Sequence, residues 1–356
     1  MTSKQRLLAA ARREEVDTIP IAPRLGFAST IHFGQNDIIA HLRLKSVYDF
    51  DPQFILSGNN YPFFSPYSAF QENDRVGIET SITDLGRTKE VRRVFSTPDG
   101  KLSEVFIVPK PGSAEYGESP NPSHTEYLVK ESADLKRLRY LLPPTDHGLA
   151  EQYQNTAAVV GDEGLCLATV YGALDHQAGS VMAMEDIMVA VLTDPSFAAE
   201  LIDLFQRQLI TQTKALLEAG VRYFFCPYYY HSLSAGWSPA IFAKWFLPLI
   251  KEQADLIHEY DGLMFYYDDG RHMGILPFLT DAQVDVVETC TPPPVGDFDL
   301  IEAKRMYGKD ITFKGFVDLI YVLQKGTVDD VQESVRFACE TGGKGFILGT
   351  SDSMRS

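Results

Sequence analysis

The second half of the chain alternates between short apolar runs and longer amphipathic runs. From Leu165 onward the strand-like runs are CLATVYG, YFFCPYYY, LMFYYDDG, VDVVETC, ITFKGFVD and GFILGTS. Two earlier runs, at 18–27 and 50–60, have the same texture and bring the strands to eight. Strands that alternate with helices pair in parallel, and eight such units close a barrel. We therefore predict an α/β fold, a (β/α)8 TIM barrel, with a doubly wound open sheet as the alternative.

Residues 76–110 interrupt this pattern. Polar and apolar side chains alternate there around a Pro98-Asp99-Gly100 turn, as they do in antiparallel hairpins. We predict a β insertion at about 76–110 and a polar loop at 111–123, both carried by a single barrel domain over 1–356. The sequence ends at Ser356, soon after the last predicted strand, so it predicts no closing C-terminal helix.

Charge and composition exclude several classes of protein. The net charge of -16 comes with no cluster of Lys and Arg, so no nucleic-acid partner is expected. No apolar run reaches the ~20 residues that cross a bilayer, so no membrane partner is expected either. The four cysteines lie far apart and form no CxxC pair, which favours a reducing, cytoplasmic location. A symmetric homodimer is the default expectation for the assembly.

Polar side chains gather where the predicted strands end, which is where (β/α)8 barrels carry their chemistry. The candidates at these ends are Arg24, His176, Tyr230, His231, Trp237, Tyr267, Asp268, Asp269, Glu288, Cys290, Asp318 and Asp352. Carboxylates that converge must share a cation, a proton or a basic substrate. Oxygen, imidazole and thiolate donors together suit Zn²⁺ with an open coordination position.

Two other readings of these residues stay open. The cluster can be a metal-free acid/base or substrate-binding site, or its members can be structural. In the structural reading Asp318 caps the next helix, one of Asp268 and Asp269 caps another, and Cys290 is a small core residue. The aromatic loop Tyr61–Phe70 can line a pocket mouth or belong to the core.

Several segments resemble the uroporphyrinogen decarboxylase superfamily. They are KQRLLAAARREEVDTIPIAP, GWSPAIFAKWFLP, YYDDGRHMGILP, VDVVETCTPPPVGDFDL, ITFKGFVD and GGKGFILGTSD. The resemblance covers nearly the whole chain and implies a (β/α)8 barrel. One branch of the superfamily decarboxylates the acetate groups of a tetrapyrrole without a cofactor. This chain keeps only Arg24 of that branch's N-terminal Arg-Gln-Ala-Gly-Arg motif, and LGTSDS lacks its late Gly-His.

The other branch moves methyl groups between small substrates, corrinoid proteins and thiols at a zinc site. Its His-x-Cys-Gly motif falls here on Tyr267-Asp268-Asp269-Gly270, and its last cysteine falls near Asp352. Oxygen donors thus replace the thiolates, which argues against zinc activation of a thiol. The methyltransferases that demethylate ethers resemble the chain best, including the β insertion.

The resemblance implies a methyltransferase that moves a methyl group from a small methoxylated or methylated substrate to a corrinoid protein, with Zn assistance and with the cobalamin on that separate partner. The metal candidates are Asp269, Glu288, Cys290, His231 and Asp352. The catalytic candidates are Tyr267, Asp268, His231 and Arg24, and the substrate-binding candidates are His176, Tyr230, Trp237 and Asp318. The alternatives are a decarboxylase of a tetrapyrrole or another acidic substrate, and a non-catalytic barrel that binds a small ligand.

Overall fold

The computed structural model describes residues 1–25, 33–34, 37–58, 63, 65–67, 75–110 and 121–353. Most of the aromatic loop Tyr61–Phe70 therefore lies outside the described residues. Contacts divide the chain into two compact units. The first unit holds residues 1–57, 147–172 and 210–356, and the second unit holds 58–146 and 173–209.

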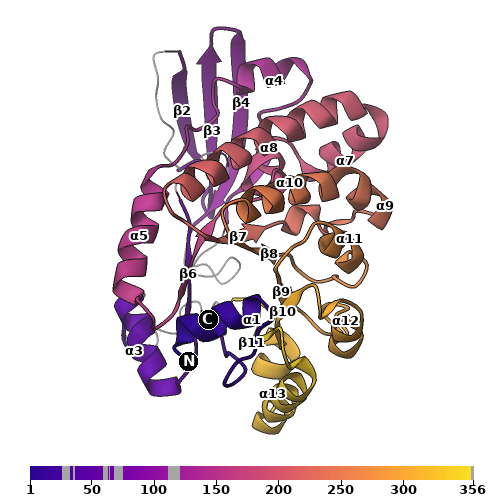
Figure 1. The fold of residues 1–356 in the computed structure, drawn as a ribbon. Coiled ribbons are helices and arrows are strands. Elements are labelled where there is room, and N and C mark those ends of the chain that lie inside the picture. Colours follow the sequence, from indigo (N-terminus) through magenta and orange to yellow (C-terminus); the bar gives the residue numbers. More distant parts are fainter. Residues whose placement is uncertain are drawn as a thin grey trace. The chain divides into compact units, whose positions relative to one another are not determined.

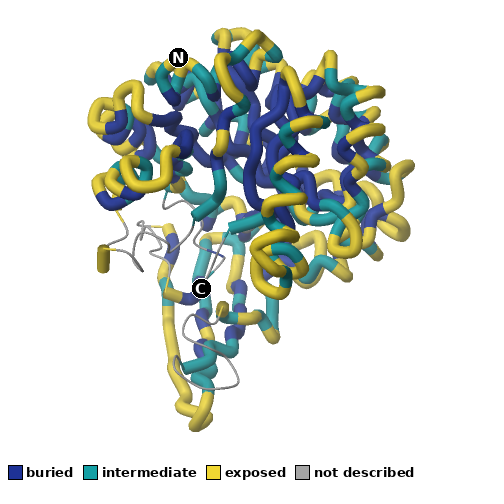
Figure 2. The backbone as a smooth tube through the Cα atoms, turned by 90° about the horizontal axis from the view of Figure 1, so that it is seen from below, coloured by how far each residue is buried: buried dark blue, intermediate teal, exposed yellow. Residues whose placement is uncertain are grey.

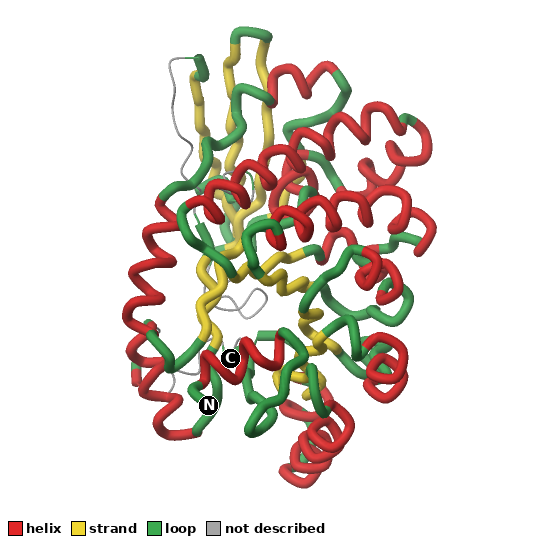
Figure 3. Tube along the Cα trace, viewed as in Figure 1, coloured by secondary structure: helices red, strands yellow, loops and turns green. Residues whose placement is uncertain are grey.

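The first unit is built on a parallel sheet with strand order β1-β6-β7-β8-β9-β10-β11. The strands are β1 (Gln53–Leu56), β6 (Leu165–Thr169), β7 (Tyr223–Pro227), β8 (Leu263–Tyr267), β9 (Val286–Cys290), β10 (Thr312–Val317) and β11 (Phe346–Thr350). Figure 3 shows these strands curling inside a layer of helices. Strands β6, β8, β9, β10 and β11 are buried along their whole length, as expected for a parallel sheet covered by helices.

The segment after α1 joins the two edges of this sheet. Ile21 makes one parallel bridge with Leu348 of β11, and the Ala22 amide donates to the Leu348 carbonyl at 2.7 Å. On the other side, the Asp51 amide donates to the Ile21 carbonyl at 2.6 Å, just before β1 begins. Seven of the predicted parallel strands are therefore present, and the described part of the predicted strand at 18–27 contributes one bridge.

Helices cover the outside of the sheet (Figure 1). Those of the first unit are α1 (Ser3–Ala11), α3 (Ile38–Tyr48), α5 (Gly148–Val160), α9 (Pro239–Ile241), α10 (Leu247–His258), α11 (Leu276–Asp281), α12 (Leu300–Tyr307) and α13 (Val328–Gly342). Two π-helical segments, Phe242–Phe246 and Leu319–Gln324, precede α10 and α13. The long helix α8 (Pro195–Glu218) has residues in both units.

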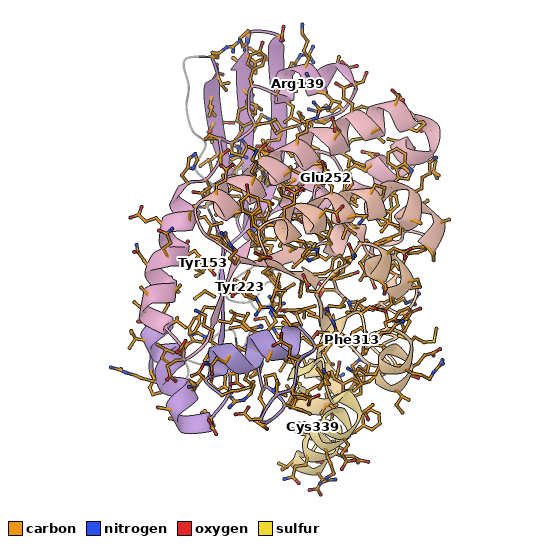
Figure 4. The ribbon with its side chains drawn as sticks, in the orientation of Figure 1. Arg139, Tyr153, Tyr223, Glu252, Phe313 and Cys339 are labelled. Carbon is orange, nitrogen blue, oxygen red and sulfur yellow. The ribbon has the colours of Figure 1, made fainter. Side chains whose placement is uncertain are left out.

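Helix α1 closes the end of the sheet where the strands begin. A Thr2 capping box starts this helix, and Leu7, Ala10 and Ala11 on its buried face pack against first residues of strands such as Leu165. Buried backbone runs through the middle of the unit and exposed backbone lies on the surrounding helices (Figure 2). On the flank, Tyr153 of α5 lies close to Tyr223 at the start of β7 (Figure 4). The polar residues described next include several near the opposite end of the sheet, where the strands finish.

The second unit contains an antiparallel sheet with strand order β2-β3-β4-β5. Its elements are β2 (Gly77–Asp84), β3 (Thr88–Thr97), β4 (Gly100–Pro109), β5 (Ser123–Glu126), α4 (Ala133–Leu138), a π-helical segment (Leu174–Ala178), α6 (Gly179–Val181) and α7 (Met184–Thr193). The first three strands are the predicted β insertion, and β3 turns into β4 at Pro98-Asp99 as expected. Most of the predicted loop 111–123 lies outside the described residues, and β5 extends the sheet beyond the prediction.

No helix in the described ranges is both long and apolar enough to cross a membrane. All four cysteines are described, and none of them forms a disulfide.

Candidate functional site

Charged and hydroxyl side chains from several strands meet inside the first unit. Tyr267 is the last residue of β8, and Glu288 is its register partner in β9. Lys314 lies in β10, and its ammonium contacts Glu288 Oε2 at 3.0 Å and the Gln53 side-chain oxygen in β1. Because β1 and β10 are not neighbours in the sheet, this last contact crosses the interior of the curled sheet.

Arg24 enters this interior from the segment that follows the Ile21 bridge. Its backbone amide donates to Thr350 Oγ1 at 3.1 Å, which ties it to the end of β11. Its guanidinium carbon lies 4.5 Å from the centre of the Tyr267 ring and 4.9 Å from that of Phe225. Burial alone would lower the pKa of Arg24, but the nearby Tyr267, Glu288 and Asp352 raise it above its ordinary value. Arg24 is therefore a permanent cation stacked on two aromatic faces.

Tyr267 and Asp352 form the polar contact next to this cation. The Tyr267 hydroxyl donates to Asp352 Oδ1 at 3.1 Å, and the same oxygen lies 3.8 Å from Arg24 Nη1. Burial raises the pKa of Tyr267, Arg24 opposes this, and the carboxylates of Asp269 and Asp352 raise the pKa further. Tyr267 consequently keeps its proton at all ordinary pH values and acts as a hydrogen-bond donor.

Strained backbone positions the second pair of charges, Glu288 and Lys314. The register between β9 and β10 shifts at Phe313/Gly315, and the non-glycine residues Thr289 and Phe316 have φ values of 61° and 92°. Bulges and left-handed residues of this kind redirect side chains and cluster at functional sites. Burial lowers the pKa of Lys314, while Glu288 counteracts that effect.

The proposed zinc ligands do not fit a zinc site. Among the described residues, no three His, Cys, Asp or Glu side chains are close enough together to hold a metal ion. Glu288 faces Lys314 and Asp352 faces Tyr267 and Arg24. Burial raises the pKa of Cys290, whose thiol donates to the Val287 carbonyl at 3.4 Å, whereas zinc binds the thiolate. We therefore derive no chemical step from zinc, and the zinc prediction stays a prediction.

The aromatic and histidine candidates after β7 belong to a packed loop. The His231 ring is fully buried between Tyr228 and Phe246, with ring centres 4.9 Å from each. The Trp237 indole N–H donates to the Tyr230 carbonyl at 2.7 Å, and its ring packs edge-on against Phe246. These contacts fix the rings of His231 and Trp237 within the loop after β7, and their proposed roles in binding and catalysis stay predictions.

The remaining candidates have other surroundings, except Asp269, whose carboxylate acts on Tyr267. Asp268 is buried and accepts a hydrogen bond from the Tyr266 hydroxyl at 3.3 Å. Asp318 accepts from the amides of Ile320 and Tyr321, so it caps the π-helical segment after β10, as the structural reading anticipated. His176 lies in the π-helical segment of the second unit, and its side chain is not described.

Sequence reasoning did not single out Lys314, Gln53 or Thr350. Lys314 carries a usable signal, because it is the one charged residue inside the otherwise apolar strand ITFKGFV. A lysine at such a position must be paired when the strand is buried on both faces. Gln53 and Thr350 carry no comparable signal, because their roles depend on contacts between segments far apart in the sequence.

Comparison with known proteins agrees with the fold. The sequence pattern of the family described as uroporphyrinogen decarboxylase (URO-D) matches residues 113–354, which is more than half of the chain. The chain belongs to the uroporphyrinogen decarboxylase family. This family consists of TIM barrels, in keeping with the curled parallel sheet of the first unit. Among curated proteins, none matches the sequence.

Solved structures extend the likeness over the full length. A methyltransferase from Methanosarcina mazei superposes with a TM-score of 0.68 at 15% sequence identity, covering 99% of this chain and 94% of that one. A B12-independent methionine synthase from Shewanella, in complex with selenomethionine, gives a TM-score of 0.46 at 10% identity, covering 95% of this chain and 91% of that one. At such low identity the first likeness shows a shared fold, and we draw nothing from the second.

Proposed function

We propose that this protein is a methyltransferase that takes a methyl group from a small methoxylated substrate and passes it to a corrinoid protein. The observation that carries the proposal is the convergence of Arg24, Tyr267 and Asp352 where the strands end. The full-length likeness to the Methanosarcina mazei methyltransferase supports it. The corrinoid, held by a separate protein, would supply the nucleophile that accepts the methyl group.

Arg24 would stabilise the oxygen that the methyl group leaves. When the carbon–oxygen bond breaks, its electron pair stays on that oxygen, which becomes an alkoxide or phenolate. The guanidinium offers a fixed positive charge and N–H donors to this oxygen in a site shielded from water. Its position is set by the Thr350 contact on its backbone and by the rings of Tyr267 and Phe225 under its guanidinium.

Tyr267 would act as a positioning residue. Because it keeps its proton, its hydroxyl donates to Asp352 and holds that carboxyl group beside the guanidinium. The carboxylate in turn limits the directions in which Arg24 can point its donors. This arrangement would perform the charge-stabilising task that a Lewis-acid metal ion can perform at an active site.

We predict that Arg24→Lys lowers methyl transfer by about 10²-fold, because lysine cannot keep a planar set of donors stacked on two rings. The assay incubates the protein with reduced corrinoid protein and methoxylated donors, and it follows the corrinoid absorbance and the demethylated product. Arg271→Lys is the matched control, since Arg271 is an exposed arginine in the loop after β8. Equal rates for wild type and Arg24→Lys would contradict the role given to Arg24.

A second candidate function is decarboxylation of an acidic substrate. It is favoured by one observation, that two buried cations, Arg24 and Lys314, line the same cavity of the first unit. Cations of this kind would hold carboxylates. Release of CO2 from an acidic substrate, without any methyl acceptor, would establish this function in place of methyl transfer.

A further inference from the structure

Strand β2 forms one edge of the antiparallel sheet in the second unit, which has the order β2-β3-β4-β5. It pairs with β3 along all of its 8 residues, and the register between the two strands does not shift. Among the described residues, no strand pairs with the other side of β2. All residues of β2 except Ile78 are exposed. An edge of this kind presents backbone N–H and C=O groups to which another strand can bond.

The two edges of this sheet differ in how well they are protected against further pairing. Proteins usually protect an edge with a short strand, a bulge, a proline or a lysine. The β5 edge follows this rule, because β5 has 4 residues and its register with β4 shifts at Val105/Phe106. Strand β2 is longer than the typical strand of about 5–6 residues. Its sequence, GIETSITD, contains neither proline nor lysine. The β2 edge is therefore open to a further strand, whereas the β5 edge is not.

The side chains of β2 indicate which strand fits this edge. Ile78, Thr80 and Ile82 occupy one face of β2, and their register partners in β3 are all buried. Ile82 is nevertheless 57% exposed. The carboxylate of Asp84, at the end of the strand, is paired with Lys110. A strand that pairs with β2 therefore has to cover an apolar side chain on this face, and it meets one carboxylate, Glu79, on the other face.

A second copy of β2 meets these requirements. Two copies related by a two-fold axis pair antiparallel, and residues opposite each other lie on the same face of the sheet. With Thr80 on the axis, Thr80 lies opposite its own counterpart, and Ile78 lies opposite Ile82 of the second copy. Such threonine and apolar pairs stabilise a sheet. On the other face Glu79 lies opposite Ser81, so this register brings no two carboxylates together.

We propose that two copies of this chain associate through β2, whose antiparallel pair joins their two sheets into one continuous sheet. The second copy supplies hydrogen-bond partners to the backbone groups on the open side of β2 and covers the exposed side chain of Ile82. The proposal goes beyond the proposed function, because association needs neither a methyl donor nor a corrinoid protein. Its test therefore fails or succeeds independently of methyl transfer.

The test is sedimentation equilibrium of the purified full-length protein over a range of concentrations, and we expect wild type to form a dimer. Thr80→Lys and Thr80→Glu should each weaken this dimer at least about tenfold, because residue 80 lies opposite itself and like charges then repel across the axis. An equimolar mixture of the two variants should form a dimer again, since opposite charges then face each other. This recovery also shows that both variants are folded.

Thr125→Lys is the matched control, because Thr125 is an exposed threonine of β5, the other edge strand of the same sheet. We expect this variant to dimerise like wild type. A wild type that stays monomeric at every concentration would overturn the proposal and leave the β2 edge to a different partner. A Thr80→Lys dimer as stable as wild type, a mixture that stays monomeric, or loss of the dimer in Thr125→Lys would each overturn it as well.

Discussion

Lys314 and Glu288 form a buried ion pair inside the first unit. Both side chains are almost fully shielded from water, and their charged atoms lie 3.0 Å apart. The free energy lost in removing two charges from water roughly cancels their attraction, so such a pair adds little net stability. Removing one member lowers the free energy of unfolding, because it leaves the other charge buried and unpaired.

Because an unpaired buried charge is costly, we expect a second substitution that removes the partner charge to restore stability. Lys314→Met should lower the free energy of unfolding by about 3–5 kcal/mol, and adding Glu288→Met should restore most of that loss. Urea denaturation followed by circular dichroism measures both. A double variant as unstable as Lys314→Met alone would show that the interior cannot repack without the charges and would contradict the account.

The sequence predicted the position of the key residues better than their roles. Arg24, Tyr267 and Asp352 were candidates because they follow strands of a parallel sheet, and the structure brings them together. Asp318 satisfied the same rule but caps a π-helical segment, because side-chain roles depend on which backbone amides lie within reach. Glu288 was a candidate metal ligand, but its side chain contacts Lys314. This contact joins β9 to β10, and the local sequence pattern could not predict it.

At the scale of elements, the parallel strands could be predicted from the sequence, because strands that are buried on both faces appear as continuous apolar runs. Strands β6 to β11 of the sheet coincide with apolar runs between amphipathic helices. The segment at 18–27 was predicted to be a strand, but its described part makes only one bridge, between Ile21 and Leu348. Its backbone bonds both to β11 and to the residues before β1, and local sequence does not reveal such long-range pairing. Strand β5 (Ser123–Glu126) is short and polar, and only pairing with β4 reveals it.

His258 at the end of α10 links this helix to two strands. Its Nε2 lies 2.9 Å from Asp285 Oδ2, and that oxygen also accepts from the Met264 amide at the start of β8. The hydrogen bond to Asp285 raises the pKa of His258 above its ordinary value of about 6.5, and burial only partly opposes this. The protonated form is therefore favoured in the folded state.

The raised pKa predicts how stability changes with pH. The contribution of the pair is complete below the unfolded pKa near 6.5 and is lost as the pH rises through the higher folded pKa. Unfolding by urea between pH 5.5 and 9 should show this loss in wild type, and His258→Gln should lack it. His147→Gln, a change at an exposed histidine before α5, should keep it. Parallel curves for wild type and His258→Gln would contradict the assignment.

At the scale of the whole molecule, family membership determines the fold more firmly than the chemistry. The uroporphyrinogen decarboxylase family match and the likeness to a methyltransferase structure agree on the parallel sheet. The same barrel supports different reactions, so the chemistry must be argued from side chains. In this chain the side chains that argue for a chemistry are Arg24, Tyr267 and Asp352, which lie together.

The central claim is that Arg24, held by Tyr267 and Asp352, stabilises the leaving oxygen without a metal ion. The measurement that tests it most directly is the rate of methyl transfer before and after metal removal with a chelator, with zinc counted by mass spectrometry. The account predicts an unchanged rate at far less than one zinc per chain. A rate that falls on chelation and returns when one zinc per chain is restored would contradict it.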